Sequence, residues 1–249
     1  YVLDHCDSRL VFASPDWAPR LRELAGQIAR GVRVIEVDPD APILPGEREA
    51  DARSPLPPAS PGSLALLMYT SGTTGKPKGA MHLHKGLTTW LRGVNQILGQ
   101  LESDERMCFL PLCHVAERMG GEYLAMYTGS KLNFVENPDT VPENVREIAP
   151  TVFTAVPRVW EKFYSAVTIA VREASLVQQV AYAWAIRVGQ QVADRVLAGQ
   201  TVPGVLKAKF MLARWVSLNN VRKLIGIHRA RSLITGAAPI SPDLIRWYL

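Results

Sequence analysis

Short apolar runs, separated by stretches with helical periodicity, recur along the whole chain and limit the folds it can adopt. The runs occupy residues 10–13, 32–37, 64–70, 107–112, 131–135, 151–155 and 231–235. Several are continuously apolar, as is typical of strands that are covered on both faces. Strands of this kind with helices between them predict an α/β fold in which mostly parallel sheets are flanked by helices.

The longest helical pattern lies between residues 158 and 226. Apolar residues over 159–196 recur at helical spacing, which indicates one very long helix or two nearly collinear helices ending near Gly199. A further helix is expected from residue 204 or 205 to about 225, closed by Gly226. An apolar stripe of Val, Ala and Trp is typical of core packing rather than of a cofactor site.

A proline-rich segment covers residues 38–62 and carries many charges. Such a composition supplies few backbone donors and little apolar surface, which favours a surface loop. A linker between two domains is the alternative. The strand pattern resumes in the same style after the segment, so the loop interpretation is preferred.

Composition excludes several classes of protein. An apolar fraction of 47% in 249 residues can build a sizeable core, so disorder, collagen and small disulfide scaffolds are excluded. The formal net charge of +5 suits an anionic ligand or an anionic membrane surface and does not require nucleic acid, which we do not expect as a partner. Residues 195–242 contain several basic residues and no acidic one. We interpret them as a solvated basic surface; the alternative is a surface that contacts lipid headgroups or cofactor phosphates.

The cysteines and the chain ends add two expectations. Cys6, Cys108 and Cys113 show no metal-binding spacing and indicate reduced thiols in a cytoplasmic protein; Cys113 is expected to be a small buried side chain rather than a nucleophile paired with its neighbour His114. No apolar stretch approaches the roughly 20 residues of a membrane span. The chain starts at Tyr1 and ends within an apparent helix, which is how a fragment of a longer protein looks.

The most informative segment follows the apolar strand at 64–68. It contains glycines, hydroxyl residues and lysines in the order Tyr69, Thr70, Ser71, Gly72, Thr73, Thr74, Gly75, Lys76, Pro77, Lys78 and Gly79. Glycines let backbone N–H groups converge, hydroxyls add donors, and lysines add positive charge, so a polyphosphate is the natural ligand. The segment is neither a Walker A loop nor a dinucleotide-binding turn, and a helix-like stretch is expected from about Leu83.

This segment, continued through residues 80–84, resembles the signature loop of the adenylate-forming enzymes, which include acyl-CoA synthetases, luciferases and peptide-synthetase adenylation domains. The resemblance implies that the loop, residues 70–75 with Lys78 and Gly79, holds the β- and γ-phosphates of ATP. It makes Lys78 the charged catalytic contact and Thr70 a ligand of Mg²⁺. From the chemistry alone, some of Thr70, Ser71, Thr73 and Thr74 are expected to touch phosphate or metal.

Two further segments extend the resemblance. The run 109–119 is similar to the family's second motif, which implies that His114, with Val115 next to it, lies beside the acyl-adenylate and acts in catalysis. The turn after the strand at 231–235 is similar to the family's adenine-binding turn, which nominates Gly236, Ala237, Ala238 and Pro239. Without the resemblance, that turn would be read as a simple turn followed by Ser241 as a helix cap.

The phrase at 155–162 and the long helical insertion at about 158–226 resemble bacterial long-chain fatty acid–CoA ligases. The resemblance implies that the chain is part of the large AMP-binding N-terminal domain. It also implies that a glutamate completing the Mg²⁺ site, a ribose-binding aspartate and the C-terminal domain would follow residue 249, and that the fragment alone is inactive. Trp160, Phe163 or the insertion helices could line an acyl tunnel, although core packing is favoured.

The implied reaction joins a fatty carboxylate to ATP, giving acyl-AMP and pyrophosphate, and then transfers the acyl group to coenzyme A. The implied setting is the cytoplasm, with peripheral contact at the inner face of an anionic membrane left open. Three alternatives also stay open: an adenylating ligase for an aryl or short-chain acid, a non-catalytic nucleotide-binding module, and a basic protein that only docks on lipid.

Overall fold

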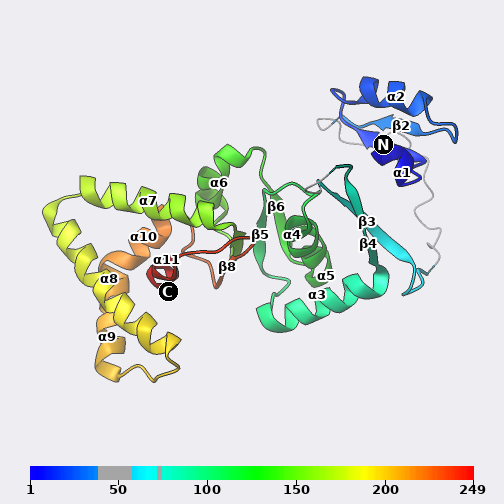
Figure 1. Cartoon of the computed structure of the whole chain (residues 1–249). Helices are drawn as coiled ribbons and strands as arrows, with labels where there is room; N and C mark the ends of the chain where they lie inside the picture. Colours follow the sequence, from blue (N-terminus) through cyan, green and yellow to red (C-terminus); the bar gives the residue numbers. More distant parts are fainter. Residues whose placement is uncertain (39–57, 72–74) are drawn as a thin grey trace. The chain divides into compact units, whose positions relative to one another are not determined.

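The computed structural model describes residues 1–38, 58–71 and 75–249 (Figure 1). The chain divides into two compact units, Tyr1–Thr89 and Trp90–Leu249, each of which is described by itself. Most of the proline-rich segment, predicted to be a surface loop, lies outside the described residues.

The first unit contains two small sheets with two short helices. Its elements are α1 (Val2–His5), β1 (Leu10–Ala13), α2 (Ala18–Gly26), β2 (Arg33–Glu36), β3 (Leu64–Thr70) and β4 (Lys78–Leu83). β1 and β2 are parallel, and β3 and β4 are antiparallel. The helix α3 (His84–Leu98) begins in this unit and continues into the second.

The strand β4 differs from the sequence prediction. The helix expected from about Leu83 is confirmed, because α3 starts at His84. The residues before it, 78–83, were not expected to form a strand, but they pair with β3. β4 has no apolar run of its own, because its sequence is Lys-Gly-Ala-Met-His-Leu. Its strand conformation comes from pairing with β3, which local periodicity does not reveal.

The second unit holds two parallel strand pairs and most of the helices. Its elements are β5 (Glu105–Cys108), α4 (Val115–Glu117), η2 (Arg118–Tyr123), α5 (Leu124–Thr128), β6 (Lys131–Phe134), η3 (Pro138–Thr140), α6 (Val141–Ile148), β7 (Val152–Ala155), α7 (Pro157–Glu173), α8 (Leu176–Leu197), α9 (Gly204–Ala213), η4 (Arg214–Leu218), α10 (Asn219–Leu224), β8 (Ser232–Thr235) and α11 (Pro242–Tyr248). β5 pairs with β6 and β7 pairs with β8, both parallel, so the predicted α/β class with mostly parallel pairing is confirmed for the described residues.

The two strand pairs of this unit are joined through β5 and β7. The Glu105 N–H donates to Thr151 Oγ1 at 2.9 Å, and the Arg106 guanidinium reaches Thr154 Oγ1 at 3.2 Å. Because these contacts advance in the same direction along both strands, the spatial order is β6, β5, β7, β8 with all four strands parallel. Their carboxyl ends therefore lie at one edge.

The main core of the second unit surrounds Phe153 of β7, which is fully buried. Trp160 and Phe163 of α7 pack on Phe153, with the Trp160 ring edge-on at 5.2 Å between ring centroids. Trp160 Nε1 donates to the carbonyl of Ala155 at 3.1 Å, which fixes the start of α7 to the end of β7. Trp160 and Phe163 are therefore core residues. This agrees with the sequence analysis, which favoured core packing over a position in an acyl tunnel.

The predicted long helix is divided into α7 and α8. Ala174 has an extended backbone, with φ −76° and ψ 166°, and Ser175 begins α8 with a capping box shared with Gln178. Figure 1 shows that α7 and α8 run in different directions, so the expectation of one helix or two nearly collinear helices is wrong. The apolar spacing continues across the break because both helices bury one face.

The second helix predicted for the insertion is confirmed, and it starts and ends close to the predicted residues. Residues 204–224 form α9, η4 and α10 in succession, with a π-helical turn between the two α-helices. Gly226 follows with φ +79°, the left-handed conformation that commonly ends helices at glycine. In the ranges 1–38, 58–71 and 75–249, no helix has the length and apolar character needed to cross a bilayer.

Candidate functional site

The predicted phosphate-binding segment is the turn of the β3–β4 hairpin. The last pairs of the ladder are Tyr69 with Gly79 and Thr70 with Lys78, so residues 71–77 connect the two strands. The side chains of Thr70 and Lys78 are exposed, and Thr70 Oγ1 makes only a long 3.5 Å contact with the carbonyl of Lys78. Both polar groups are therefore accessible to a ligand.

The remaining predicted residues of this turn are partly described. Ser71 and Gly75 are exposed, whereas the predicted contacts Gly72, Thr73 and Thr74 lie outside the described residues. Gly75 has φ +119°, a conformation that residues with a side chain rarely adopt. A Cβ at Gly79 would come within 2.9 Å of the Leu67 side chain, so glycine fits where the two strands pack closely.

The helix α1 supports the base of the turn, which the sequence did not indicate. The Tyr1 hydroxyl donates to the carbonyl of Pro77 at 3.2 Å, and His5 Nδ1 lies 2.7 Å from the Tyr69 hydroxyl. Lys76 Nζ lies 5.1 Å from the centre of the Tyr1 ring, a cation–π contact. The two lysines of the turn thus differ, because Lys76 has an aromatic neighbour and no such contact is recorded for Lys78 in the described part of the chain.

His114 lies at the start of α4, at the end of a short segment that follows β5. The expected strand at 107–112 begins two residues earlier and ends at Cys108. His114 has an extended backbone, and its Nδ1 accepts a hydrogen bond from the Ala116 N–H at 3.2 Å as a helix N-cap. Its side chain is exposed, as is that of Val115, so both are accessible at the carboxyl end of β5.

Glu117 holds this segment in place, a role that the sequence analysis did not assign to it. Its side chain is 5% exposed, and its Oε2 accepts the N–H of Leu110 at 3.0 Å and that of Phe109 at 3.4 Å. A buried carboxylate that accepts backbone N–H groups fixes the path of the chain. The only signal in the sequence was an acidic residue within a mostly apolar segment.

The two cysteines of this region lie in different surroundings. Burial, together with the negative charge of Glu117, raises the pKa of the Cys108 thiol to about 12, so Cys108 is an inert core thiol. Burial lowers the pKa of the Arg106 guanidinium, and the nearby Glu117 opposes that effect. Cys113 is exposed, so its predicted burial is wrong; strand alternation does not apply because β5 ends at Cys108.

The predicted adenine-binding turn follows β8. Gly236, Ala237, Ala238 and Pro239 are all exposed, and Ala237 has φ +69°, a left-handed conformation that is uncommon for a residue with a side chain. Ser241 then occupies the N-cap position of α11, without a side-chain capping hydrogen bond. The turn is therefore an exposed run of small residues that includes a left-handed alanine, and the Ser241 side chain does not cap the helix.

The structure brings two of the three predicted segments to one edge. The segment that carries His114 follows the carboxyl end of β5, and the Gly236 turn follows the carboxyl end of β8. These strands flank β7 and are parallel to it, and ligands of α/β sheets bind at the carboxyl ends of the strands. The third segment, the predicted phosphate-binding turn, belongs to the other unit and is described by itself.

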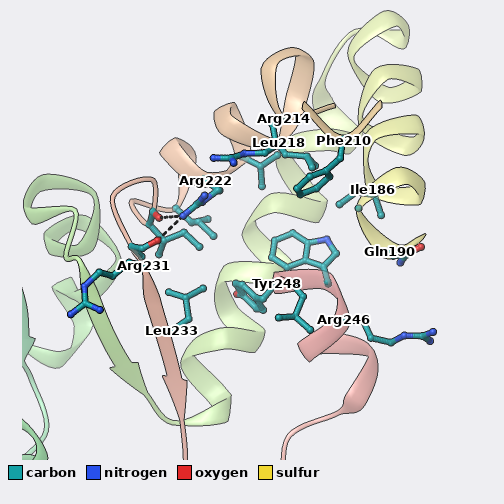
Figure 2. A pocket seen from close by; sticks show the side chains of 17 residues that line it. Ile186, Gln190, Phe210, Arg214, Leu218, Arg222, Arg231, Leu233, Arg246 and Tyr248 are labelled. Carbon is teal, nitrogen blue, oxygen red and sulfur yellow. Dashed lines mark hydrogen bonds between the residues drawn. The ribbon is translucent and has the colours of Figure 1, made fainter. Parts of the chain in front are cut away.

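A cavity of about 400 Å³ lies elsewhere in the second unit, among α8, α9, α10, β8 and α11 (Figure 2). Apolar side chains such as Phe210 and Leu233 form much of its wall. Arg222 at its edge donates to the carbonyls of Ile227 and Ala230 at 3.2 and 2.8 Å. None of the predicted site residues lines this cavity, so we do not assign the reaction to it.

Metal-binding side chains are the remaining component of the candidate site. Within residues 1–38, 58–71 and 75–249, no three His, Cys, Asp or Glu side chains are grouped so that they could hold a metal ion. Mg²⁺ is usually bound through one or two protein oxygens together with substrate phosphates and water. The exposed Thr70 hydroxyl fits the role of one such protein ligand.

Comparison with known proteins identifies the family of the chain. Residues 1–249 match the family described as "AMP-binding enzyme", and the chain belongs to this family. It is 35% identical to the long-chain fatty acid–CoA ligase ACSBG2 of Gallus gallus, over 81% of the chain and 27% of the relative. It is 26% identical to the peroxisomal long chain acyl-CoA synthetase 7 of Arabidopsis thaliana, over 98% of the chain and 36% of the relative.

Solved structures extend the comparison to the fold. The inhibitor-bound N-terminal domain of FACL13 from Mycobacterium tuberculosis matches with a TM-score of 0.61 and 20% identity, over 99% of this chain and 49% of that one. At that identity the likeness concerns the fold alone. The chain spans about a third of the length of the curated relatives it matches.

Proposed function

We propose that the intact protein containing this chain activates a long-chain fatty acid with ATP and transfers it to coenzyme A. In the first step a carboxylate oxygen attacks the α-phosphorus of ATP, the bond to the β-phosphate oxygen breaks, and acyl-AMP and pyrophosphate form. In the second step the coenzyme A sulfur attacks the acyl carbon and AMP leaves. Residues 1–249 are then part of the large AMP-binding domain, with a helical insertion at about 158–226.

The observation that carries this proposal is that Thr70 and Lys78, both exposed, face each other at the end of the β3–β4 ladder. A carboxylate and a triphosphate repel each other, so the first step depends on positioning and on fixed positive charge. Lys78 supplies such a charge at the end of a paired strand, and the hydroxyls of Thr70 and Ser71 lie at the start of the same turn. In the proposed complex, residues 70–75, Lys78 and Gly79 contact the β- and γ-phosphates.

Mg²⁺ would neutralise charge on the phosphates, and Thr70 is the residue of this chain proposed to hold it through its hydroxyl oxygen. The other oxygen ligands would come from the phosphates and from water. No other residue of the described chain is assigned to the metal.

The two segments at the strand edge of the second unit are proposed to bind the rest of the adenylate. The exposed turn of Gly236, Ala237, Ala238 and Pro239 offers a flat backbone surface against which the adenine ring can lie. His114, together with Val115, is proposed to lie beside the acyl-phosphate bond. Because His114 Nδ1 accepts the Ala116 N–H, a neutral His114 carries its proton on Nε2 and can donate it to an oxygen there.

The relatives named as long-chain ligases and the helices α7 to α10 support a long-chain acid as the substrate. The three free cysteines support a reducing compartment, and we place the reaction in the cytoplasm. An adenylating ligase for an aryl or short-chain acid is the alternative. A structural neighbour described as an anthranilate CoA ligase, at 24% identity and a TM-score of 0.55, shares the fold.

The test is ATP-dependent thioester formation by the intact protein with acetate, octanoate, palmitate and benzoate as separate substrates. The proposal predicts that kcat/KM is highest with palmitate and that AMP and pyrophosphate accumulate with the thioester. A preference for benzoate or acetate would establish the alternative ligase. Tight ATP binding without any adenylate from these acids would instead indicate a nucleotide-binding module without catalysis.

A further inference from the structure

The helix α9 and the turn η4 that follows it carry apolar side chains on two opposite faces, and the described residues cover only one of these faces. On the inner face, Leu206, Phe210 and Ala213 pack against Ala185 and Val188 of α8. Helices that are apolar on all sides are normally covered on all sides, in a core or by lipid. Among residues 1–38, 58–71 and 75–249, nothing covers the outer face of α9, although its composition indicates a partner.

The outer face forms a continuous stripe, which we call the outer stripe and define as Val205, Ala208, Met211, Leu212 and Trp215. Ala208, Met211, Leu212 and Trp215 follow the spacing i, i+3, i+4, i+7, which places them on one side of a helix. Met211 is 66% exposed and Trp215 is 78% exposed, so large apolar groups project into solvent. Contiguous exposed apolar surface of this kind marks an interaction site.

Cations border the outer stripe on both sides. Helical spacing places Lys207 along one side and Lys209 along the other, and both are exposed. No acidic residue occurs from 195 to 242, and neither lysine has an ion pair within the described part of the chain. Figure 1 shows α9 beside α8, at the end of the second unit away from its strands.

We propose that the outer stripe docks on the surface of an anionic lipid bilayer. α9 would lie in the plane of the interface, with Met211 and Leu212 at the acyl boundary, Trp215 at headgroup level and the lysines on lipid phosphates. With ten residues, α9 is about 15 Å long, so it is too short to cross the hydrocarbon core.

Other partners fit this surface less well. A nucleic acid would meet the cations but would leave the apolar stripe against water and phosphate. A second copy of the chain, packed stripe to stripe, would bring the same cations against each other, which is unfavourable. An anionic bilayer satisfies both components at once, and its binding does not depend on the proposed ligase activity.

The experiment measures flotation of the intact protein with vesicles, without ATP or fatty acid. Vesicles of phosphatidylcholine alone are compared with vesicles in which about one third of the lipid is phosphatidylglycerol. The proposal predicts binding to the anionic vesicles that weakens at high salt, and little binding to the neutral ones. The double variant Met211→Glu with Trp215→Glu should reduce the bound fraction at least about tenfold.

Two further variants complete the design. Ile97→Glu, at an 86% exposed apolar position of α3 outside the outer stripe, should bind vesicles as the wild type does. Lys207→Gln with Lys209→Gln keeps the apolar stripe and should weaken binding to anionic vesicles only. If the first double variant does not fold, this lysine variant decides the outcome.

Three results would overturn the proposal: a wild type that does not float, a Met211/Trp215 variant that floats as well as the wild type, or a Lys207/Lys209 variant with unchanged binding. A change from dimer to monomer in the Met211/Trp215 variant would assign the outer stripe to self-association instead. A protein that binds vesicles but ligates no acid would refute the proposed function and leave this inference intact.

Discussion

Thr70 and Lys78 are cross-strand partners at the last pair of the β3–β4 ladder. The turn proposed to bind phosphate therefore starts and ends at two residues whose separation is set by sheet hydrogen bonding. Lys78 follows the turn on a paired strand, so its backbone is ordered before any ligand arrives. This arrangement suits a fixed electrostatic contact, whose effect depends on prior positioning.

Gly121 should be essential for the conformation of the segment that carries His114. A Cβ at residue 121 would lie 1.9 Å from Glu117 Oε1, and Glu117 is buried with its other oxygen on the Leu110 N–H. Gly121→Ala should displace this carboxylate and lower the free energy of unfolding by about 2 kcal/mol or more, measured by urea denaturation of the intact protein.

The neighbouring glycine provides the control. A Cβ at Gly120 would meet nothing within 4 Å, so Gly120→Ala should leave the unfolding midpoint within error of the wild type or raise it slightly. Equal effects of the two substitutions would show that Glu117 does not depend on the space at residue 121.

Replacing Gly226 by alanine should destabilise the protein more than the same substitution at a glycine that has a positive φ but no close neighbours. Its φ is +79°, and a Cβ there would come within 2.3 Å of the Val145 carbonyl oxygen, which belongs to the backbone and cannot rotate away. Gly226→Ala should cost more than about 3 kcal/mol of unfolding free energy, because conformational strain and a clash add.

Gly199 separates these two contributions. It has φ +65°, but a Cβ at this position would meet nothing within 4 Å, so Gly199→Ala tests the strain alone. Its expected cost is about 1 to 2 kcal/mol. A Gly226→Ala variant no less stable than Gly199→Ala would contradict the close approach of residue 226 to α6.

Asp104 and Arg231 should make stability depend on pH in the acidic range. Hydrogen bonds from the Arg231 guanidinium hold the pKa of the nearly buried Asp104 carboxyl well below its usual range, and those from Leu101 N–H and Thr151 add to this effect. A lowered carboxyl pKa contributes stability above the unfolded value, about 3.9, and that contribution is lost as the pH falls below it.

Arg231→Met tests this dependence. At about pH 7 the substitution leaves a buried carboxylate without its partner and should cost about 1 to 3 kcal/mol, since Arg231 itself is partly exposed. The difference from the wild type should shrink as the pH falls towards about 3, where Asp104 becomes protonated in the variant. As a control, Arg20→Met removes an exposed pair with Glu23 and should cause no measurable change at either pH.

Sequence patterns predicted those elements whose formation depends on their own residues. The apolar runs at 64–70 and 131–135 and the helix limits at 204 and 226 follow from local composition and correspond to elements in the structure. The strand β4 was not predicted, because its residues form a strand only by pairing with β3. The break between α7 and α8 was also missed, although Ser175 and Gln178 form a capping box, because the apolar spacing continued across it.

The predicted site is only partly described by the structure. The His114 segment follows β5 and the Gly236 turn follows β8, on either side of β7, as the position of each after a predicted strand indicated. The role of Glu117 could not be predicted, because its partners are backbone N–H groups at the strand end and no side-chain pattern marks them. Similarly, the support of the turn by Tyr1 and His5 joins residues more than 60 positions apart, as the separations of 76 and 64 show.

The most direct test of the phosphate-binding turn compares its two lysines in the pyrophosphate exchange reaction of the intact protein. Lys78→Ala should lower the fatty-acid-dependent exchange rate by about 10²- to 10³-fold, whereas Lys76→Ala, which removes a contact with the Tyr1 ring, should leave it nearly unchanged. Exchange by Lys78→Ala at the wild-type rate, or an equal loss in both variants, would contradict the account.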